Sequence, residues 1–220
     1  MLNRYLTVNE YGKKSIIIRK SEFIGYVKNA TTEEDAIEFI NSIKKKHHDA
    51  THNCSAYMIG EKDEIQKAND DGEPSGTAGK PILEVIKKNN LKDTVIVVTR
   101  YFGGILLGAG GLIRAYGQTA SEGIKAAGVI ERILHTIVSI QIDYTWLGKI
   151  ENELNNRGYQ VKAIDYLDTV TVHVYIEIGQ EENFQNWITN LTNGQAKITI
   201  GEQLYLDIPY FRDDTDSTEE

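Results

Sequence analysis

The stretch VTVHVYIEI, residues Val170–Ile178, decides the fold of the C-terminal half of this chain. Valine or isoleucine stands at every even position, and Thr171, His173, Tyr175 and Glu177 stand between them. Such strict alternation is typical of a β-strand with one face in a core and the other face at solvent. The neighbouring sequence is therefore expected to cover one face of a sheet.

Three more strands and two helices are predicted around this stretch. The helices are predicted over residues 147–157 and 181–191, and the strands over residues 138–142, 159–167 and 198–208. Gly158 and the pair Asn193–Gly194 end the two helices, and Asp168 supplies the turn before VTVHVYIEI. The order strand–helix–strand–strand–helix–strand predicts a ferredoxin-like antiparallel sheet with both helices on one face.

The N-terminal half mixes the same elements less regularly. The run TVIVVT, residues 94–99, is typical of a central strand that is buried on both faces. Thr31 and Thr32 precede a helix that is expected to carry Ile37, Ile40 and Ile43 inward. Other strands are expected over residues 15–19, 22–28, 55–60 and 64–68, and other helices over residues 80–89 and 110–127. The pattern predicts a mixed α/β layer, so the whole chain is assigned to the α+β class.

Two domains are expected to meet near Ile130. Gly128 ends the last helix of the N-terminal half, and the chain leads directly into the C-terminal half without a long linker. The predicted domains cover residues 1–130 and 131–212. Residues 213–220, DDTDSTEE, are predicted to be a disordered acidic tail.

The composition is that of a folded, soluble protein, with 40% hydrophobic and 25% charged residues. No apolar run reaches the roughly 18–20 residues of a membrane span, and the N-terminus lacks the apolar core of a secretory signal. A single cysteine excludes an internal disulfide, so the cytoplasm is the expected location. The net charge of −8 is uneven, since residues 1–133 carry +2 and residues 134–220 carry −10. Any nucleic-acid surface is therefore expected in the N-terminal half.

The loop DDGEPSGTAGKP, residues 70–81, is the first candidate site. It lies directly before a predicted helix, whose unpaired N–H groups could bind an anion, and its carboxylates could hold a cation or act as a base. The spacing is not that of a P-loop, because Pro81 stands where a P-loop has Ser or Thr. A turn-rich connection without a ligand is the alternative. The candidate residues are Asp70, Asp71, Glu73, Ser75, Thr77 and Lys80.

The second candidate site is TRYFGGILLGAGGLIRAYG, residues 99–117. Five glycines separate a buried strand from a helix, but Ile113 stands where a dinucleotide-binding turn requires its third glycine. Arginine beside aromatic residues suits recognition of a phosphate, a nucleobase or a protein. In the alternative interpretation the aromatic residues belong to the core and the arginines form structural ion pairs. The candidate residues are Arg100, Tyr101, Gly103, Gly104, Gly110, Gly111, Arg114 and Tyr116.

The segment KKKHHDATHNC, residues 44–54, brings three histidines and Cys54 together in sequence. A structural zinc site usually draws a second pair of ligands from further along the chain, and none is evident. No metal and no cofactor are therefore expected, and Cys54 is predicted to be a small buried residue rather than a nucleophile. The sequence also has no recognisable Ser-His-Asp order, HExxH motif or paired CxxC motif, so no catalytic constellation is assigned.

Two blocks, DDGEPSGTAGKPIL (residues 70–83) and VVTRYFGGILLGAGGLIRAYG (residues 97–117), resemble the signature of the YigZ/Impact family. The resemblance extends over the whole chain and includes His52, Asn53 and Cys54. It implies an N-terminal domain of the fold called ribosomal protein S5 domain 2-like, and a C-terminal domain similar to the last domain of elongation factor G. It also implies the bacterial-type arrangement, without the RWD domain of eukaryotic relatives that regulate translation during amino-acid starvation.

The favoured hypothesis is a non-catalytic binding protein. It would contact the ribosome, RNA or a translation factor through the glycine-rich face of the N-terminal domain. Two alternatives stay open: a protein–protein adaptor that uses the acidic C-terminal sheet, and an enzyme for a small phosphorylated or peptide-like substrate. No membrane partner is expected, and the sequence does not indicate the oligomeric state.

Overall fold

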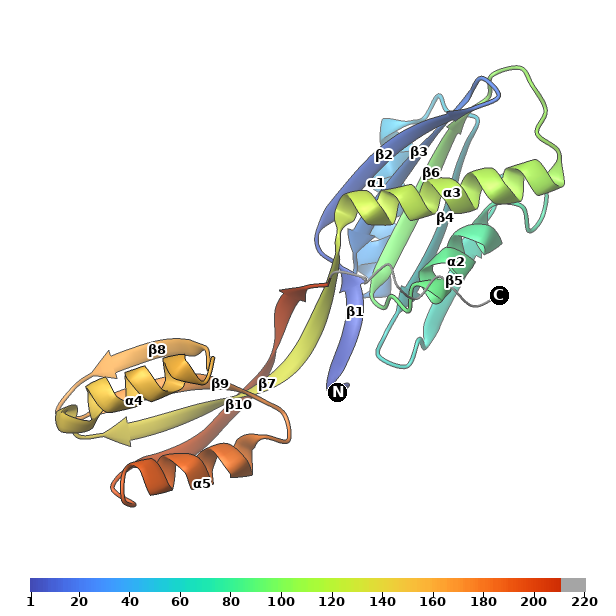
Figure 1. Ribbon diagram of the computed structural model, residues 1–220. Helices are drawn as coiled ribbons and strands as arrows, with labels where there is room; N and C mark the ends of the chain where they lie inside the picture. Colours follow the sequence, from blue (N-terminus) through green and yellow to red (C-terminus); the bar gives the residue numbers. More distant parts are fainter. Residues whose placement is uncertain (211–220) are drawn as a thin grey trace, which may run out of the picture. The chain divides into compact units, whose positions relative to one another are not determined.

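The computed structural model describes residues 1–210, which form five helices and ten strands (Figure 1). The strands make two five-stranded antiparallel sheets, so the predicted α+β class is confirmed. The chain divides into two compact units, the first consisting mainly of Tyr5–Glu131 and the second mainly of Arg132–Asp207. The tail predicted for residues 213–220 lies outside the described residues. None of the described helices has the length and hydrophobicity needed to span a membrane.

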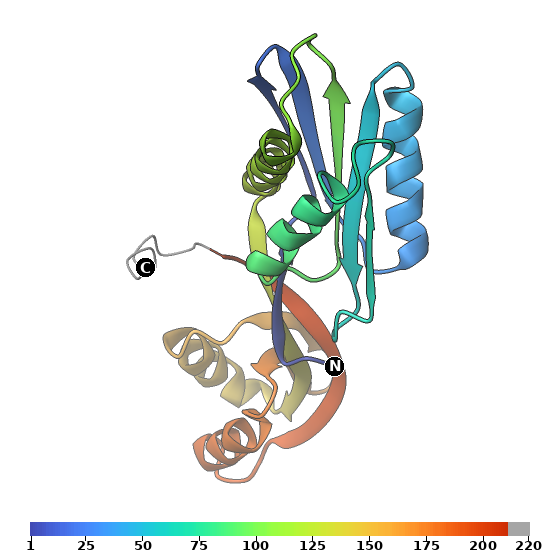
Figure 2. The ribbon, with the colours of Figure 1, turned by 90° about the vertical axis from the view of Figure 1, so that its right-hand side faces the viewer.

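The first unit has three layers (Figure 2). Its sheet has the order β2-β3-β6-β4-β5, with helix α1 on one face and helices α2 and α3 on the other. Its elements are β2 (Tyr11–Ile18), β3 (Ser21–Asn29), α1 (Glu33–Lys46), β4 (His52–Ile59), β5 (Ile65–Asn69), α2 (Gly79–Lys88), β6 (Thr94–Tyr101) and α3 (Ala109–Ala127).

Strand β6 is the central strand that the apolar run TVIVVT predicts. Ile96 and Val98 face the core beneath α2 and α3, whereas Val95 and Val97 face the core beneath α1. All four side chains are fully buried. A strand that serves two cores needs apolar residues at every position, which explains why this segment does not alternate.

Helix α1 begins where it was predicted, because the Thr32 side chain caps it by accepting a hydrogen bond from a backbone amide in the first turn. The prediction of its inward face was partly wrong. Ala36, Phe39 and Ile43 are buried, whereas Ile37 is 44% exposed. Positions three and four residues apart share a helix face, and Phe39 rather than the neighbouring isoleucines selects that face.

The second unit has the predicted order of elements. These are β7 (Val129–Ile142), α4 (Tyr144–Asn156), β8 (Val161–Tyr166), β9 (Val170–Glu177), α5 (Glu181–Leu191) and β10 (Lys197–Pro209). The sheet runs β1 (Arg4–Val8), β7, β9, β8, and β10 also pairs with β7. Ile150 and Leu154 of α4 share one core with Phe184 and Ile188 of α5, so both helices cover the same face of the sheet.

Two strands differ from the prediction. Strand β1 (Arg4–Val8) was not predicted, since its five residues carry no clear alternation. Strand β7 is continuous over 14 residues and joins the predicted strand to the segment before it. Strand β10 agrees with the predicted strand over residues 198–208 and continues through Gly201, where a Cβ would lie 2.9 Å from the Ile137 carbonyl oxygen. Glycine therefore marks a close backbone approach at this position instead of an interruption.

Candidate functional site

Several loops of the first unit meet where β6 ends. The β2–β3 turn lies there, because Glu22 pairs with Tyr101, and β4 starts there, because His52 pairs with Arg100. Helix α2 begins beside Asn69, the last residue of β5. Both signature blocks therefore contribute to one end of the sheet, which we call the glycine-loop end.

The Asp70 carboxylate fills the amide cradle at the start of α2. It accepts hydrogen bonds from the backbone amides of Gly76, Ala78 and Gly79 at 2.8, 3.0 and 2.8 Å. Burial alone would raise the pKa of Asp70, but these three hydrogen bonds outweigh it and lower the pKa below its ordinary value. The anion that the sequence predicts at this helix N-terminus is thus supplied by the chain itself.

The Asp71 carboxylate is also engaged within the protein. It pairs with the Lys44 ammonium at 2.5 Å and accepts the Asn53 backbone amide at 2.7 Å. Burial opposes its ionisation, yet these contacts lower the pKa of Asp71. Of the other predicted loop residues, Ser75 is exposed, whereas Thr77 is buried and donates its hydroxyl to the Pro74 carbonyl oxygen at 2.6 Å.

The third loop carboxylate, Glu73, is the centre of a buried polar cluster. Its Oε1 accepts hydrogen bonds from Arg100 Nη1 at 2.6 Å and from the Tyr116 hydroxyl at 2.8 Å. Glu73 is 8% exposed, Arg100 is 5% exposed and Tyr116 is fully buried. The Arg100 guanidinium also lies over the rings of Phe23 and Phe102, 5.3 and 5.4 Å from their centroids. Arg100 and Tyr116 therefore lie inside the unit, where they hold the first signature block against the second.

The single cysteine lies beside this cluster. Cys54 is fully buried and its Sγ donates to the Asp70 carbonyl oxygen at 3.0 Å. Burial is the main reason why the pKa of Cys54 rises to about 12. The burial of Cys54 confirms the prediction of a small buried residue. The raised pKa keeps the thiol protonated and disfavours a thiolate nucleophile.

The histidines of residues 44–54 have separate partners. His47 lies between the hydroxyls of Tyr26 and Tyr101, at 2.5 and 2.8 Å, and burial lowers the pKa of His47. His52 Nδ1 lies 2.8 Å from the Asp71 carbonyl oxygen. Within residues 1–210, no group of three or more His, Cys, Asp or Glu side chains is arranged to hold a metal ion.

The accessible part of the glycine-loop end combines cations with apolar side chains. Phe102, Ile105, Leu106 and Ile113 are 44, 39, 82 and 45% exposed. The exposed residues of the glycine-loop end that carry charge or a large apolar side chain are Arg19, Lys20, Lys80, Phe102, Ile105, Leu106, Ile113 and Arg114. Sequence reasoning included Lys80 and Arg114 but missed Arg19 and Lys20, because strand pairing places their turn beside β6 from far away in the sequence.

Glycine is required at different positions of this end for different physical reasons. A Cβ at Gly103 would lie 2.0 Å from the Lys20 carbonyl oxygen, so this glycine lets the loop pack on the β2–β3 turn. Gly104 has φ +81°, a conformation that side chains disfavour. Gly110 and Gly111 lie in the first turn of α3, which has no side-chain cap and no acidic residue. The exposed loop is therefore tied down at its start and leads into a helix N-terminus that favours negative charge.

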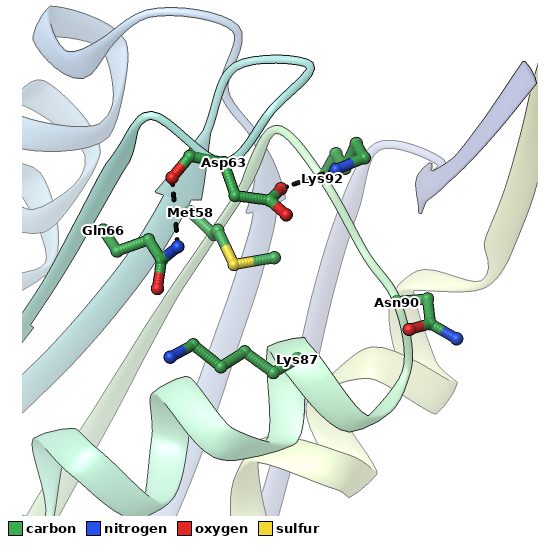
Figure 3. Close-up of a pocket in the computed structure, with 6 residues that line it drawn as sticks. All are labelled: Met58, Asp63, Gln66, Lys87, Asn90 and Lys92. Carbon is green, nitrogen blue, oxygen red and sulfur yellow. Dashed lines mark hydrogen bonds and ion pairs between the residues drawn. The ribbon is translucent and has the colours of Figure 1, made fainter. Parts of the chain in front are cut away.

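A hollow of about 360 Å³ lies at the opposite end of the sheet (Figure 3). It is lined by Met58, Asp63, Gln66, Lys87, Asn90 and Lys92. Asp63 and Lys92 pair across it at 2.7 Å and so neutralise each other, and only Lys87 adds a further charge. None of the predicted site residues lines this hollow, so the glycine-loop end remains the candidate site.

Two family models match the chain. The Impact N-terminal domain matches residues 19–124, and a domain of unknown function, DUF1949, matches residues 140–195. A solved structure titled as that of a hypothetical protein has 28% sequence identity and a TM-score of 0.59, covering 92% of this chain and 98% of its own chain.

Named relatives agree with these matches. The protein IMPACT homolog of Dictyostelium discoideum is 39% identical over 44% of this chain and 29% of its own length. The IMPACT family member YigZ of Escherichia coli (strain K12) is 32% identical over 84% of this chain and 92% of its own. The IMPACT family member YvyE of Bacillus subtilis (strain 168) is 58% identical over 94% of this chain and 95% of its own. Identity of this extent, over both units, shows that the chain belongs to the IMPACT family.

Proposed function

We propose that the first unit is a non-catalytic binding domain that contacts the ribosome through the glycine-loop end, and that the protein acts as a regulator associated with translation. The observation that carries this proposal is the exposure of Leu106, at 82%, beside exposed cations in a family signature block. Free RNA or a separate translation factor would use part of the same surface.

The composition of the glycine-loop end favours a target with both phosphate and protein surfaces. Arg19, Lys20, Lys80 and Arg114 supply positive charge for a phosphate backbone. The four exposed apolar side chains are unfavourable in water if nothing covers them. Contiguous exposed apolar surface is a mark of interaction sites. A ribosome presents both kinds of surface.

The engaged carboxylates argue against the enzymatic alternative in this unit. Asp70 is bound by three amides, Asp71 by Lys44 and an amide, and Glu73 by Arg100 and Tyr116. A metal ion or substrate at these groups would have to displace partners that already satisfy them. The loop carboxylates therefore support the shape of the glycine-loop end instead of offering a reactive group.

The fold names and the domain limits also belong to this proposal. The order of elements in the second unit and the strand order β10-β7-β9-β8 support a ferredoxin-like domain over residues 131–212. The family match supports the S5 domain 2-like fold for residues 1–130. A cytoplasmic location follows from a ribosomal partner.

Cosedimentation with ribosomes at graded salt concentrations tests the proposal. The variant Lys80→Glu/Arg114→Glu should weaken binding at least tenfold. It should also flatten the salt dependence by about one unit of slope for each phosphate that the variant no longer neutralises. The matched control Lys62→Glu/Lys88→Glu makes the same charge change at the other end of the sheet, among exposed residues.

The apolar contribution needs its own pair of variants. Leu106→Ser should weaken ribosome binding about tenfold, whereas Ile37→Ser, on α1 and 44% exposed, should leave it unchanged. Binding that is unaffected by both glycine-loop variants would refute the proposal. If Leu106→Ser still binds free RNA but no longer binds ribosomes, the contact of Leu106 is with a protein component of the ribosome.

A further inference from the structure

Within the described residues, no helix covers the second face of the sheet in the second unit. Because α4 and α5 pack on the face that carries Val172 and Val174, the alternate residues of β9 point to the other face. His173 is one of these, and Ser139 of β7 lies directly opposite it in the ladder. Cross-strand partners face the same side, so the two side chains meet on the uncovered face.

A row of hydrogen bonds joins three strands on this face. Ser139 Oγ lies 2.8 Å from His173 Nδ1, and His173 Nε2 lies 2.9 Å from Asp165 Oδ2 of β8. An ionised carboxylate only accepts hydrogen bonds, so the tautomer that fits both contacts carries a proton on Nε2 and offers the Nδ1 lone pair to the Ser139 hydroxyl. The histidine thus accepts from a serine and donates to a carboxylate, which is the arrangement of an activated nucleophile.

A β-bulge in β8 brings Asp165 to this face. The register shifts between Val161, which pairs with Val174, and Ala163, which pairs with His173. Without the extra residue, Asp165 would be opposite Val170 and would face the helices. With it, Asp165 is opposite Thr171, on the same side as His173, and Ala163 is directly opposite His173. Bulges that re-aim a side chain in this way are over-represented beside active sites.

The row is accessible from solvent. The side chains of His173 and Asp165 are 23 and 63% exposed, and Ser139 is partly exposed. All three lie within the second unit, so the row does not depend on the glycine-loop end.

We propose that Ser139, His173 and Asp165 form a reactive-serine site that accepts an acyl group from carboxylic esters. Ser139 Oγ attacks the ester carbonyl carbon while its proton passes to His173 Nδ1. The bond to the alkoxy group then breaks, and the leaving alcohol takes the proton from Nδ1. Water, activated by the same nitrogen, adds to the acyl-serine and releases the carboxylic acid and the free hydroxyl. Asp165 holds the ring and stabilises its charged form.

The sheet limits the class of substrate. Ser139 lies in β7, which pairs with β9 and β10, so backbone amides around it are engaged in the ladders and do not form an oxyanion hole. The site is therefore assigned to esters with good leaving groups, which need little stabilisation of the oxyanion. This activity goes beyond the binding function proposed for the first unit.

The test is covalent labelling of the full chain with p-nitrophenyl acetate and with a biotinylated fluorophosphonate, followed by peptide mass spectrometry. Ser139 should be labelled at least tenfold faster than Ser15, an exposed serine that donates to Glu22 and has no histidine partner. His173→Gln should reduce labelling of Ser139 to the rate of Ser15. Fluorescence of Trp146 and Trp187, both in the second unit, reports whether each variant is folded.

Asp165→Asn tests the positioning role. Loss of the carboxylate should shift the rise of the Ser139 labelling rate to lower pH, an effect that a structural role alone would not produce. Labelling of Ser139 no faster than Ser15, or labelling that persists in folded His173→Gln, would overturn the proposal. If the unchanged chain does not bind ribosomes but Ser139 is still labelled, the proposed function is refuted and this site is left standing.

Discussion

Replacing Glu73 by alanine tests the buried cluster that holds the two signature blocks together. The change removes the partner of the Arg100 guanidinium, which is 5% exposed, and the acceptor of the Tyr116 hydroxyl. An uncompensated buried charge costs about 3–5 kcal/mol, and removal of a neutral hydrogen bond adds about 1 kcal/mol. Because the whole protein is expected to be stable by only about 5–15 kcal/mol, the effect should be large.

The chain contains its own probe for this measurement. Cys54 is its single cysteine and is fully buried in the first unit, so a thiol reagent reacts with it only after that unit opens. In the regime where reclosing is faster than labelling, a loss of about 3 kcal/mol accelerates labelling more than about 100-fold. The two tryptophans lie in the second unit, and their fluorescence should change little.

Two comparison variants sharpen the result. Glu73→Gln keeps an acceptor for Tyr116 but removes the charge. Its loss of stability relative to the wild type should therefore be smaller than that of Glu73→Ala. Glu73→Leu combined with Arg100→Met removes both charges, and its cost should be smaller than that of Glu73→Ala, since no buried ion is left unpaired. Labelling of Cys54 within about twofold of wild type in Glu73→Ala would refute the account of this cluster.

Four other substitutions give separate tests. The pKa of Asp70 is lowered in the folded protein, so the stability that its carboxylate contributes is complete above about pH 4 and is lost as the pH falls through the folded-state pKa. Asp70→Asn should therefore make the protection of Cys54 from thiol labelling less dependent on pH in that range. Gly103→Ala should cost several kcal/mol because its Cβ would meet backbone at 2.0 Å, whereas Gly110→Ala, whose nearest contact is 3.8 Å away, should stabilise α3 by about 1 kcal/mol in thermal unfolding. Thr32→Ala should lower stability by about 1 kcal/mol through loss of the cap of α1, measured by urea unfolding.

Much of the fold could be predicted because the hydrophobic pattern matches the layers. The alternation in Val170–Ile178 corresponds to β9, and the apolar run at residues 94–99 corresponds to a strand between two cores. Strand β1 and the bulge in β8 could not be predicted, because both depend on pairing partners that are distant in sequence. The inward face of α1 was predicted only in part, because apolar residues occur on more than one side of this helix.

The candidate site likewise has features that the sequence predicts and features that depend on contacts between distant residues. The signature blocks named two loops that the structure brings together, but not the fact that Asp70 fills its own amide cradle or that Arg100 is buried against Glu73. These contacts join residues on different elements, and sequence spacing does not report them. The row of Ser139 and His173 was missed for the same reason, since only strand register brings a serine and a histidine 34 positions apart into contact.

Site-specific photo-crosslinking in cells tests the central claim most directly. A photoreactive amino acid in place of Leu106, which is 82% exposed in the glycine-loop end, should give cross-links to ribosomal components. The same amino acid in place of Ile37, exposed on α1 of the same unit, should not. Cross-links of equal yield at both positions, or none at position 106, would contradict a ribosome-binding role for the glycine-loop end.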